Sequence, residues 1–274
     1  MKQFFVIAIV GVTFLLSVTS CKYIARYGSQ KIILKIAKEL VETGEEKTLK
    51  ELATSSKVLR LLYNGLEQRL GRDFVDNVVV RSAGDDVLEL YSKNFPTSRV
   101  YYNLRTNTME GAAGSLQGAG PVNEFFNVML PNMHYKIDGC FSYTTDRYGR
   151  VIYASSDRSK AMAIQRNPRR NSDIQRDVVE QMDGQKGVDD AGHLFANNTG
   201  GPNEMINQVP MLRDINRNGD WRKIELLEED ALKAGKNVIS QRKLLYKGRS
   251  KKPYAIEVTI IIDNRKYKQV IKLV

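Results

Sequence analysis

His193 is one of only two histidines in the 274 residues, and its neighbours are of types that handle protons, metals and phosphate. It follows Asp190 and Gly192 and precedes a short apolar run at 194–196, so we expect it at the start of a strand that faces a cleft. A neutral imidazole can take a proton from water near neutral pH. His193 is therefore a candidate general base for a hydrolytic reaction.

Two asparagines further along, Asn216 and Asn218, are candidate metal ligands because an amide oxygen suits Mg²⁺, which binds few protein groups and keeps several waters. In a regular helix Asn218 would share a face with Glu225, seven residues later, and Asn216 would not. Gly219 and Asp220 favour a helix that begins only after Gly219, since glycine destabilises helix interiors and aspartate caps helices. If the helix starts that late, Asn216 lies outside it and need not share a helix face with Glu225. We therefore expect Asn216 to be the ligand, with Asn218 as the alternative.

Several short motifs occur in a fixed order around these residues. They are Tyr-x-x-Asp-x-x-Gly-Arg-Val at 143–151, Asp-x-Gly-His-Leu at 190–194, Gly-Gly-Pro at 200–202, Asn-Gln-Val-Pro-Met at 207–211, and Asn-Arg-x-x-x-Trp with its Glu at 216–225. Together with Arg176 and Gln181, this order resembles the DNA/RNA non-specific endonucleases. These are ββα-metal, or His-Me finger, nucleases, and the resemblance is to the branch found in bacterial toxin and secreted-nuclease domains. It covers roughly residues 131–274.

The resemblance implies a role for each matching residue. His193 would be the general base, and Asn216 would be the protein ligand of one Mg²⁺ or Mn²⁺ ion. Glu225 would hold water on the metal, and Arg176 would steady the phosphate. The implied reaction is metal-dependent, sequence-non-specific hydrolysis of phosphodiester bonds in DNA, RNA or both.

The resemblance also implies an α+β fold, in which an antiparallel sheet core carries the ββα-metal motif after a helical N-terminal segment. A cognate inhibitor protein is a further implied partner. Two features depart from the family pattern. Ala191 stands where many relatives carry Arg, and the segment from Asn216 to Trp221 is one residue longer than the commonest pattern. The added residue is why Asn218 competes with Asn216.

The charge distribution favours a polyanionic partner. Residues 131–274 hold 26 Lys and Arg against 18 Asp and Glu, so +8 of the net charge of +11 lies in this half. Basic residues near the motifs are candidate phosphate contacts, although a solvated loop is the alternative for each: Arg166, Arg169, Arg170, Arg217 and Arg222.

The first 21 residues have the form of an export signal, with Lys2 followed by an apolar run at 4–18. That run is shorter than the about 20 residues that span a bilayer. It ends in Val-Thr-Ser before Cys21, which resembles a lipoprotein box. We therefore expect cleavage before Cys21, lipidation of its sulfur and anchoring in the cell envelope. An ordinary signal peptide and a secreted product are the alternative.

The rest of the chain must position these residues. Helical spacing of apolar residues at 32–41, a capping box of Thr48 and Glu51, and a leucine stripe at 59–70 predict a helical N-terminal region at 22–110. Within it, 85–108 could form strands or short helices. A Gly- and Ala-rich stretch predicts a linker at 111–130.

Residues 131–274 are expected to form the endonuclease domain. The pattern predicts a hairpin at 140–154, helices at 172–181 and 226–234, and strands at 237–246 and 254–262. Two other functions remain open: a catalytically inactive nucleic-acid-binding descendant, or a surface lipoprotein that binds another protein through its helical region.

Overall fold

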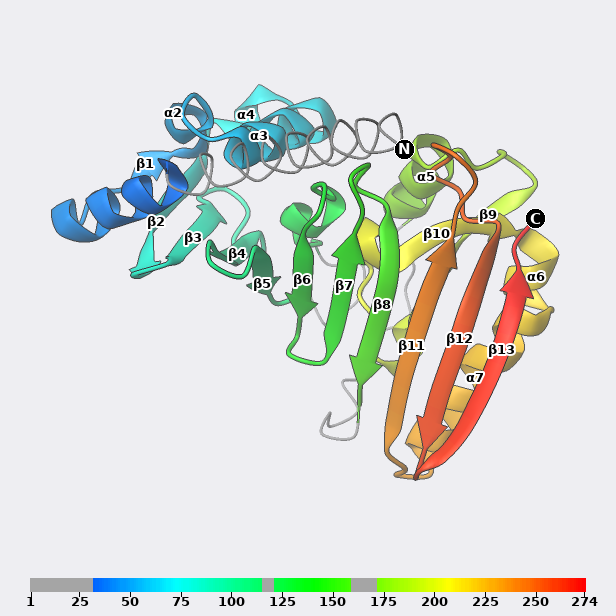
Figure 1. The fold of residues 1–274 in the computed structure, drawn as a ribbon. Helices are drawn as coiled ribbons and strands as arrows, with labels where there is room; N and C mark the ends of the chain where they lie inside the picture. Colours follow the sequence, from blue (N-terminus) through cyan, green and yellow to red (C-terminus); the bar gives the residue numbers. More distant parts are fainter. Residues whose placement is uncertain (1–31, 115–120, 159–171) are drawn as a thin grey trace, which may run out of the picture.

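The computed structural model describes residues 32–114, 121–158 and 172–274 (Figure 1). The predicted export signal at 1–21 with its lipidated Cys21, and the candidate phosphate contacts Arg166, Arg169 and Arg170, lie outside the described residues. Within the described ranges, every helix is too short or too polar to cross a bilayer.

One eleven-stranded sheet runs through the described chain, and neighbouring strands are antiparallel except for the parallel pair β5–β6. Its strands, in spatial order, are β1 (Lys47–Thr48), β2 (Val78–Gly84), β3 (Val87–Ser92), β4 (Arg99–Asn103), β5 (Thr108–Gly111), β6 (His134–Ile137), β7 (Phe141–Thr145), β8 (Val151–Asp157), β11 (Val238–Leu245), β12 (Ala255–Ile262) and β13 (Arg265–Lys272).

The expected N-terminal helices are present. A helix occupies residues 32–43, followed by α2 (Leu49–Ala53), α3 (Lys57–Leu70) and α4 (Arg72–Val75). The predicted capping box forms, because Thr48 accepts from the main-chain N–H of Glu51 and the Glu51 carboxylate accepts from that of Thr48. The leucine stripe of α3 is a packing face, as expected from its spacing.

The expectation of a helical region extending to residue 110 is wrong beyond α4. Strands β2 to β5 occupy most of residues 78–111, because β-branched runs such as Val78-Val79-Val80, in which all three side chains are buried, favour a strand. The predicted linker at 111–130 also needs correction. Residues 124–127 form the 3₁₀ helix η1, and both Phe125 and Phe126 are fully buried. The N-terminal region and the following domain therefore share one sheet.

The C-terminal part adds the elements that carry the conspicuous motifs. These are α5 (Ser172–Gln181), β9 (Asp189–His193), η2 (Asn197–Thr199), η3 (Met205–Asn207), β10 (Gln208–Leu212), α6 (Arg213–Arg217) and α7 (Asp220–Lys233). Strands β9 and β10 form a separate antiparallel pair. Helices α6 and α7 cover one face of β11 to β13, and the other face is open (Figure 1).

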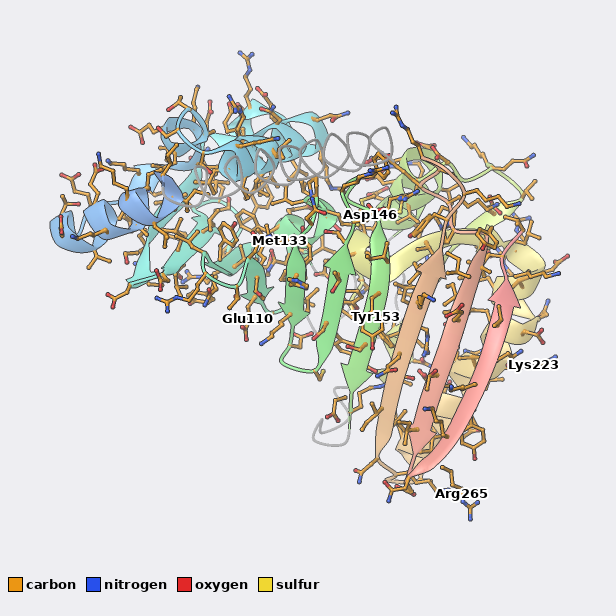
Figure 2. The ribbon with its side chains drawn as sticks, in the orientation of Figure 1. Glu110, Met133, Asp146, Tyr153, Lys223 and Arg265 are labelled. Carbon is orange, nitrogen blue, oxygen red and sulfur yellow. The ribbon has the colours of Figure 1, made fainter. Side chains whose placement is uncertain are left out.

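The fold class predicted from sequence is confirmed: an antiparallel sheet core with a strand–strand–helix unit, β9–β10–α7, after N-terminal helices. The β7–β8 hairpin, α5, β11 and β12 are also where the sequence predicts them. Strand β13 was not predicted. Figure 2 shows Lys223 of α7 on the side of the molecule where β13 lies, far from Glu110 of β5.

Candidate functional site

The sequence pattern predicts His193 at the start of a strand, but His193 is the last residue of β9. The pairing of β9 with β10 stops at His193 and Gln208. The main-chain carbonyl of His193 accepts a hydrogen bond of 3.0 Å from Nε1 of Trp221. Trp221 is fully buried and lies in the first turn of α7. The strand end that carries His193 is thus fixed against the helix that carries Glu225.

Asn207 holds the loop that follows His193. Its side-chain oxygen accepts from the N–H of Phe195 at 3.0 Å, and its amide nitrogen donates to the carbonyls of Phe195 and Pro202 at 2.9 and 2.8 Å. The Tyr143 hydroxyl donates to the same side-chain oxygen at 3.0 Å. Asn207 has no exposed surface. The first residue of the Asn-Gln-Val-Pro-Met motif is therefore structural, and it joins the motif at 143–151 to the loop after the histidine.

These elements enclose a cavity of about 340 Å³. Its lining comes from α5, the end of β9, the η2 loop, α6 and α7: Gln175, His193, Ala196, Asn197, Asn198, Asn216, Arg217, Arg222 and Glu225. The structure thus brings together five residues singled out from sequence, including His193, Asn216 and Glu225. A candidate base, an amide oxygen, a carboxylate and two guanidinium groups share one solvent-accessible space.

The two candidate ligands are separated by the junction of α6 and α7. Helix α7 begins at Asp220, so the predicted late start is confirmed, with Gly219 rather than Asp220 at the capping position. Asn216 lies in the short α6, and Asn218 follows that helix as an exposed residue outside the cavity lining. A side chain at Gly219 would meet the Ile215 backbone at 2.7 Å, so the junction requires glycine.

Asp190 orients both α6 residues of the cavity. Its carboxylate accepts from Nδ2 of Asn216 at 3.4 Å and from Arg217 at 2.6 and 3.0 Å. Burial alone would raise the pKa of Asp190, but the hydrogen bonds from Arg217 and Asn216 hold it below its ordinary value. Because Nδ2 of Asn216 is engaged by Asp190, its carbonyl oxygen Oδ1 is the atom available to a cation.

The donor set fits a hard divalent ion. Amide and carboxylate oxygens suit Mg²⁺ or Mn²⁺, which can bind through one or two protein groups and retain waters. The carboxylate of Glu225 accepts from Arg222 at 3.0 Å, which fixes its position on α7. In the described parts of the chain, clusters of three or more His, Cys, Asp or Glu side chains are absent.

Arg176, the residue that the family resemblance assigns to the phosphate, is not among the residues that line the cavity. Its guanidinium pairs with Asp173 at 3.0 Å and its side chain is 56% exposed. The preceding residue, Gln175, lines the cavity instead, since consecutive helical residues point about 100° apart. Sequence reasoning also assigned no role to Asn197 and Asn198. Gln175 is identified only by the side of α5 that faces the cavity, and local sequence patterns do not specify that side.

A buried charge cluster that sequence reasoning also missed lies behind the loop of η2. Glu228 accepts from Arg158 at 2.7 Å, from Arg242 at 2.5 Å and from the Ser240 hydroxyl. Burial alone would raise the pKa of Glu228, but the charges of Arg242 and Arg158 lower it to about 2. Arg158 also donates to Thr199 of η2 at 2.9 Å, and the guanidinium of Arg242 lies 5.5 Å from the Trp221 ring. The cluster ties β8, β11 and α7 to the cavity wall.

Comparison with known proteins finds a match for the part of the chain that carries these motifs. Residues 131–264 match the family model described as DNA/RNA non-specific endonuclease. Among solved structures, NucA from Streptococcus agalactiae, with no metal bound, is 16% identical over 77% of this chain and 87% of that chain, with a TM-score of 0.36. The Sda1 nuclease with a bound zinc ion is 22% identical over 31% and 38%, with a TM-score of 0.29. An extracellular endonuclease is 15% identical over 49% and 78%, with a TM-score of 0.32.

Proposed function

We propose that this chain is a metal-dependent nuclease, because residues 131–264 match the family model described as DNA/RNA non-specific endonuclease. It hydrolyses phosphodiester bonds of DNA, RNA or both, at internal positions and without sequence preference. The observation that carries the proposal is the cavity of about 340 Å³, which gathers His193, Asn216, Glu225, Arg217 and Arg222.

His193 is the group that takes the proton from the attacking water. The other histidine, His134, is exposed on β6 and contacts Thr144, so it lies outside the cavity lining. The hydrogen bond from Trp221 to the His193 carbonyl holds the main chain of the base in place. A positioned base of this kind contributes about 10²–10⁴ to the rate.

The oxygen Oδ1 of Asn216 is the proposed protein ligand of Mg²⁺ or Mn²⁺, and Glu225 orients water beside it. A bound divalent ion would polarise the phosphate and stabilise the charge that develops on the leaving oxygen. Asp190 supports this arrangement by holding the amide nitrogen of Asn216, so that the oxygen is presented.

Arg217 and Arg222 are the proposed phosphate contacts. Both line the cavity, and both are anchored by carboxylates, Asp190 and Glu225, that fix the guanidinium positions. Contacts of this type position the backbone and carry no sequence information, which is consistent with non-specific cleavage. Nucleic acid is also the partner favoured by the +8 charge of residues 131–274.

Export and lipid anchoring complete the proposal, and both are supported by the sequence of residues 1–21 alone. A lipidated Cys21 would attach the enzyme to the cell envelope and leave the nuclease domain able to reach extracytoplasmic nucleic acid. Secretion without an anchor is the alternative.

The test is cleavage of supercoiled plasmid and of RNA by the purified protein with Mg²⁺, repeated with chelator. His193→Ala should lose about 10²–10⁴ or more of the rate and keep its fold and DNA affinity, whereas the control His134→Ala should cleave normally. Near-wild-type turnover of His193→Ala would remove the assignment of the base. DNA binding without any cleavage would instead indicate an inactive binding descendant. If the protein neither binds nor cleaves nucleic acid, the remaining hypothesis is a surface lipoprotein that binds another protein.

A further inference from the structure

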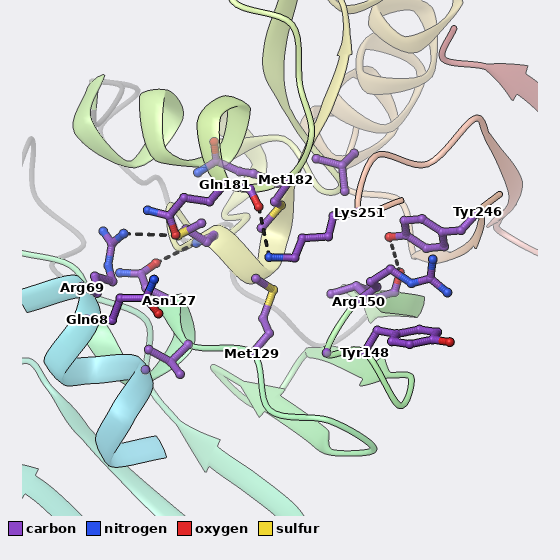
Figure 3. A pocket seen from close by; sticks show the side chains of 17 residues that line it. Gln68, Arg69, Asn127, Met129, Tyr148, Arg150, Gln181, Met182, Tyr246 and Lys251 are labelled. Atoms are coloured by element: carbon purple, nitrogen blue, oxygen red, sulfur yellow. Dashed lines mark hydrogen bonds between the residues drawn. The ribbon is translucent and has the colours of Figure 1, made fainter. Parts of the chain in front are cut away.

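A second cavity, of about 520 Å³, lies between the N-terminal helices and the nuclease domain (Figure 3). It falls within the size range of small-molecule sites, about 300–1,000 Å³. Its walls come from α3, the η1 segment, the β7–β8 turn, the end of α5, β10 and the loop between β11 and β12. The catalytic residues discussed above are not part of this lining.

The charged residues that line the second cavity are Arg69, Arg150 and Lys251, and no Asp or Glu is among its described lining residues. Two of these cations form ion pairs within the protein. Arg69 pairs with Glu124 and Asp177, and Arg150 pairs with Asp146. Lys251 is different. Its ammonium donates to the main-chain carbonyl of Gln181 at 3.3 Å, and among the described residues no carboxylate pairs with that ammonium, although the Asp183 carboxylate accepts from the main-chain N–H of Lys251 at 2.7 Å. Lys251 reaches across the cavity toward α5 (Figure 3) and is available to an anion.

Flat and hydrogen-bonding surfaces accompany that cation. Arg150 lies between two tyrosine rings, 4.9 Å from the centre of Tyr148 and 4.4 Å from that of Tyr246. Tyr148 is 36% exposed at the edge of this wall, and the exposed Arg147 also lies 4.7 Å from the centre of its ring, so a planar group that stacks there would displace that surface guanidinium. Carboxamides from several elements line the cavity: Gln68, Asn127, Gln181 and Gln208.

Gln208 points to a ligand most directly. It is 2% exposed, its Nε2 donates to the carbonyl of Asn203 at 2.6 Å, and its buried Oε1 has no hydrogen-bond partner among the described residues. A buried polar atom that lacks a partner is costly, and a donor from a ligand or water would satisfy it. Asn127 is already engaged, since its amide donates to Glu124 at 2.8 Å and its oxygen accepts from the N–H of Met205 at 2.7 Å. The carboxamides of Gln68 and Gln181, each a donor and an acceptor, can match the edge of a nucleobase, and Gln208 adds an acceptor.

The second cavity shares two walls with the catalytic cavity. Helix α5 contributes Gln175 to the catalytic side and Gln181 to the other, six residues or about 9 Å apart along its axis. The β9–β10 pair contributes His193 to one cavity and its register partner Gln208 to the other. The two cavities are therefore neighbours that have α5 and the β9–β10 pair in common.

We propose that the second cavity is a nucleotide-binding subsite, in which Gln68, Gln181 and Gln208 contact a base, Tyr148 stacks on it and Lys251 contacts its phosphate. The inference rests on the proposed nuclease function. The nucleotide belongs either to the substrate strand, outside the bond that is cut, or to a free product. Binding there raises affinity for nucleic acid without supplying a group to the reaction.

The test compares two double variants of the full chain in a His193→Ala background, so that substrate is not consumed. The cavity variant is Tyr148→Ala/Lys251→Ala. The control is Tyr267→Ala/Lys268→Ala on β13, which removes one exposed tyrosine and one exposed lysine elsewhere. Affinity for a short single-stranded oligonucleotide should fall by about 5–10-fold or more in the cavity variant and stay unchanged in the control. Loss of one phosphate contact should also make the slope of log binding constant against log salt concentration shallower by about 0.7.

Titrations with AMP and with inorganic phosphate, in chelator, distinguish the sources. Competition between AMP and the oligonucleotide, lost in the cavity variant, would identify a site that also takes free product. Oligonucleotide binding that depends on the cavity but ignores AMP would identify a subsite for the strand. Phosphate binding as tightly as AMP would overturn the proposal, because the cavity would then be a simple anion site.

The active enzyme separates this inference from the proposed function. In the enzyme that keeps His193, the Tyr148→Ala/Lys251→Ala substitutions should raise KM for long substrates. If the wild type cleaves nucleic acid and the cavity variant matches it in affinity and KM, the nucleotide subsite is wrong while the nuclease stands. If the wild type neither cleaves nor binds nucleic acid and AMP does not bind, both proposals fail.

Discussion

The indole Nε1 of Trp221 donates a hydrogen bond of 3.0 Å to the main-chain carbonyl of His193. Glu225 follows Trp221 by four residues, about one helical turn, and therefore projects from nearly the same side of α7. This one contact couples the strand that carries the proposed base to the helix that carries the proposed carboxylate. It also gives a structural reason for the spacing between Trp221 and Glu225.

Replacing Trp221 with Phe keeps most of the buried ring and removes that hydrogen bond. Leaving the His193 carbonyl unsatisfied should cost about 1–3 kcal/mol of stability, or a few degrees in Tm. The rate of plasmid cleavage should fall even at temperatures where the variant is fully folded, because the His193 main chain is no longer held. Tyr102→Phe is the control, because its hydroxyl also makes a partly buried hydrogen bond, of 2.8 Å to Asn107, far along the sheet. Equal activity of the two variants would show that the contact only stabilises the fold.

Local patterns were enough to predict part of this structure. The capping box of Thr48 and Glu51, the β7–β8 hairpin and the start of α7 after Gly219 depend on residues close in sequence. Strands β2 to β5 were harder, because their short alternating runs fit either a strand or a short helix. Their place in the sheet depends on long-range pairing, including the parallel contact of Thr108 with His134.

The site shows the same division. The motif order located His193 and the Asn216–Glu225 segment, and the cavity brings those residues together. Assigning roles to Arg176 and Gln175 requires knowing which side of α5 faces the cavity, and this depends on how the helix packs in the fold. Glu228 looked like an ordinary charged helix residue, and only the folded packing of Arg158 and Arg242 around it shows a buried cluster.

The facing of α5 leads to a ranking of its two neighbouring residues. Gln175→Ala should lower kcat/KM by about tenfold, since it removes a hydrogen-bonding group from the catalytic cavity. Arg176→Ala should have a smaller effect, because that guanidinium pairs with Asp173 at the surface. Steady-state cleavage of a fluorogenic oligonucleotide measures both. A larger loss in Arg176→Ala would return the arginine to the phosphate-binding role implied by the family resemblance.

Glu228→Gln should destabilise the protein strongly. It leaves Arg158 and Arg242 buried without a counter-charge, and breaking such a network costs about 3–5 kcal/mol near neutral pH. In the wild type, the Glu228 pKa is lowered from 4.5 to about 2. Its contribution is therefore complete above pH 4.5 and is lost as pH falls toward 2.

Urea unfolding at pH 7 and at about pH 3 checks this dependence, and the gap between wild type and Glu228→Gln should narrow in acid. The control is Glu257→Gln, which removes a half-exposed carboxylate paired with Lys243 and should cost less than about 1 kcal/mol. A Glu228→Gln protein as stable as the control at pH 7 would contradict the assignment of a charged Glu228.

Cys21→Ser should release the protein from membranes, because the acyl chains on Cys21 are the proposed hydrophobic attachment after signal cleavage. Cell fractionation and metabolic labelling with a fatty acid measure the effect. The chain has two cysteines, so Cys140→Ser is the matched control and should stay membrane-bound and labelled. A wild-type protein that is soluble and unlabelled would support the ordinary signal peptide and a secreted nuclease.

Asn216→Ala should weaken magnesium dependence far more than Asn218→Ala. Asn216 lines the cavity with His193 and Glu225, and Asp190 holds its amide nitrogen so that Oδ1 remains for the ion. Asn218 is exposed after α6 and does not line the cavity.

Cleavage rates measured against Mg²⁺ concentration should therefore show a raised magnesium requirement and a large loss of maximal rate for Asn216→Ala. Asn218→Ala should follow the wild-type curve, and it serves as the matched control because it deletes the same amide two residues away. Thermal unfolding of both variants without metal separates a lost ligand from a disturbed α6. The opposite ranking, with both variants folded, would move the ion to Asn218.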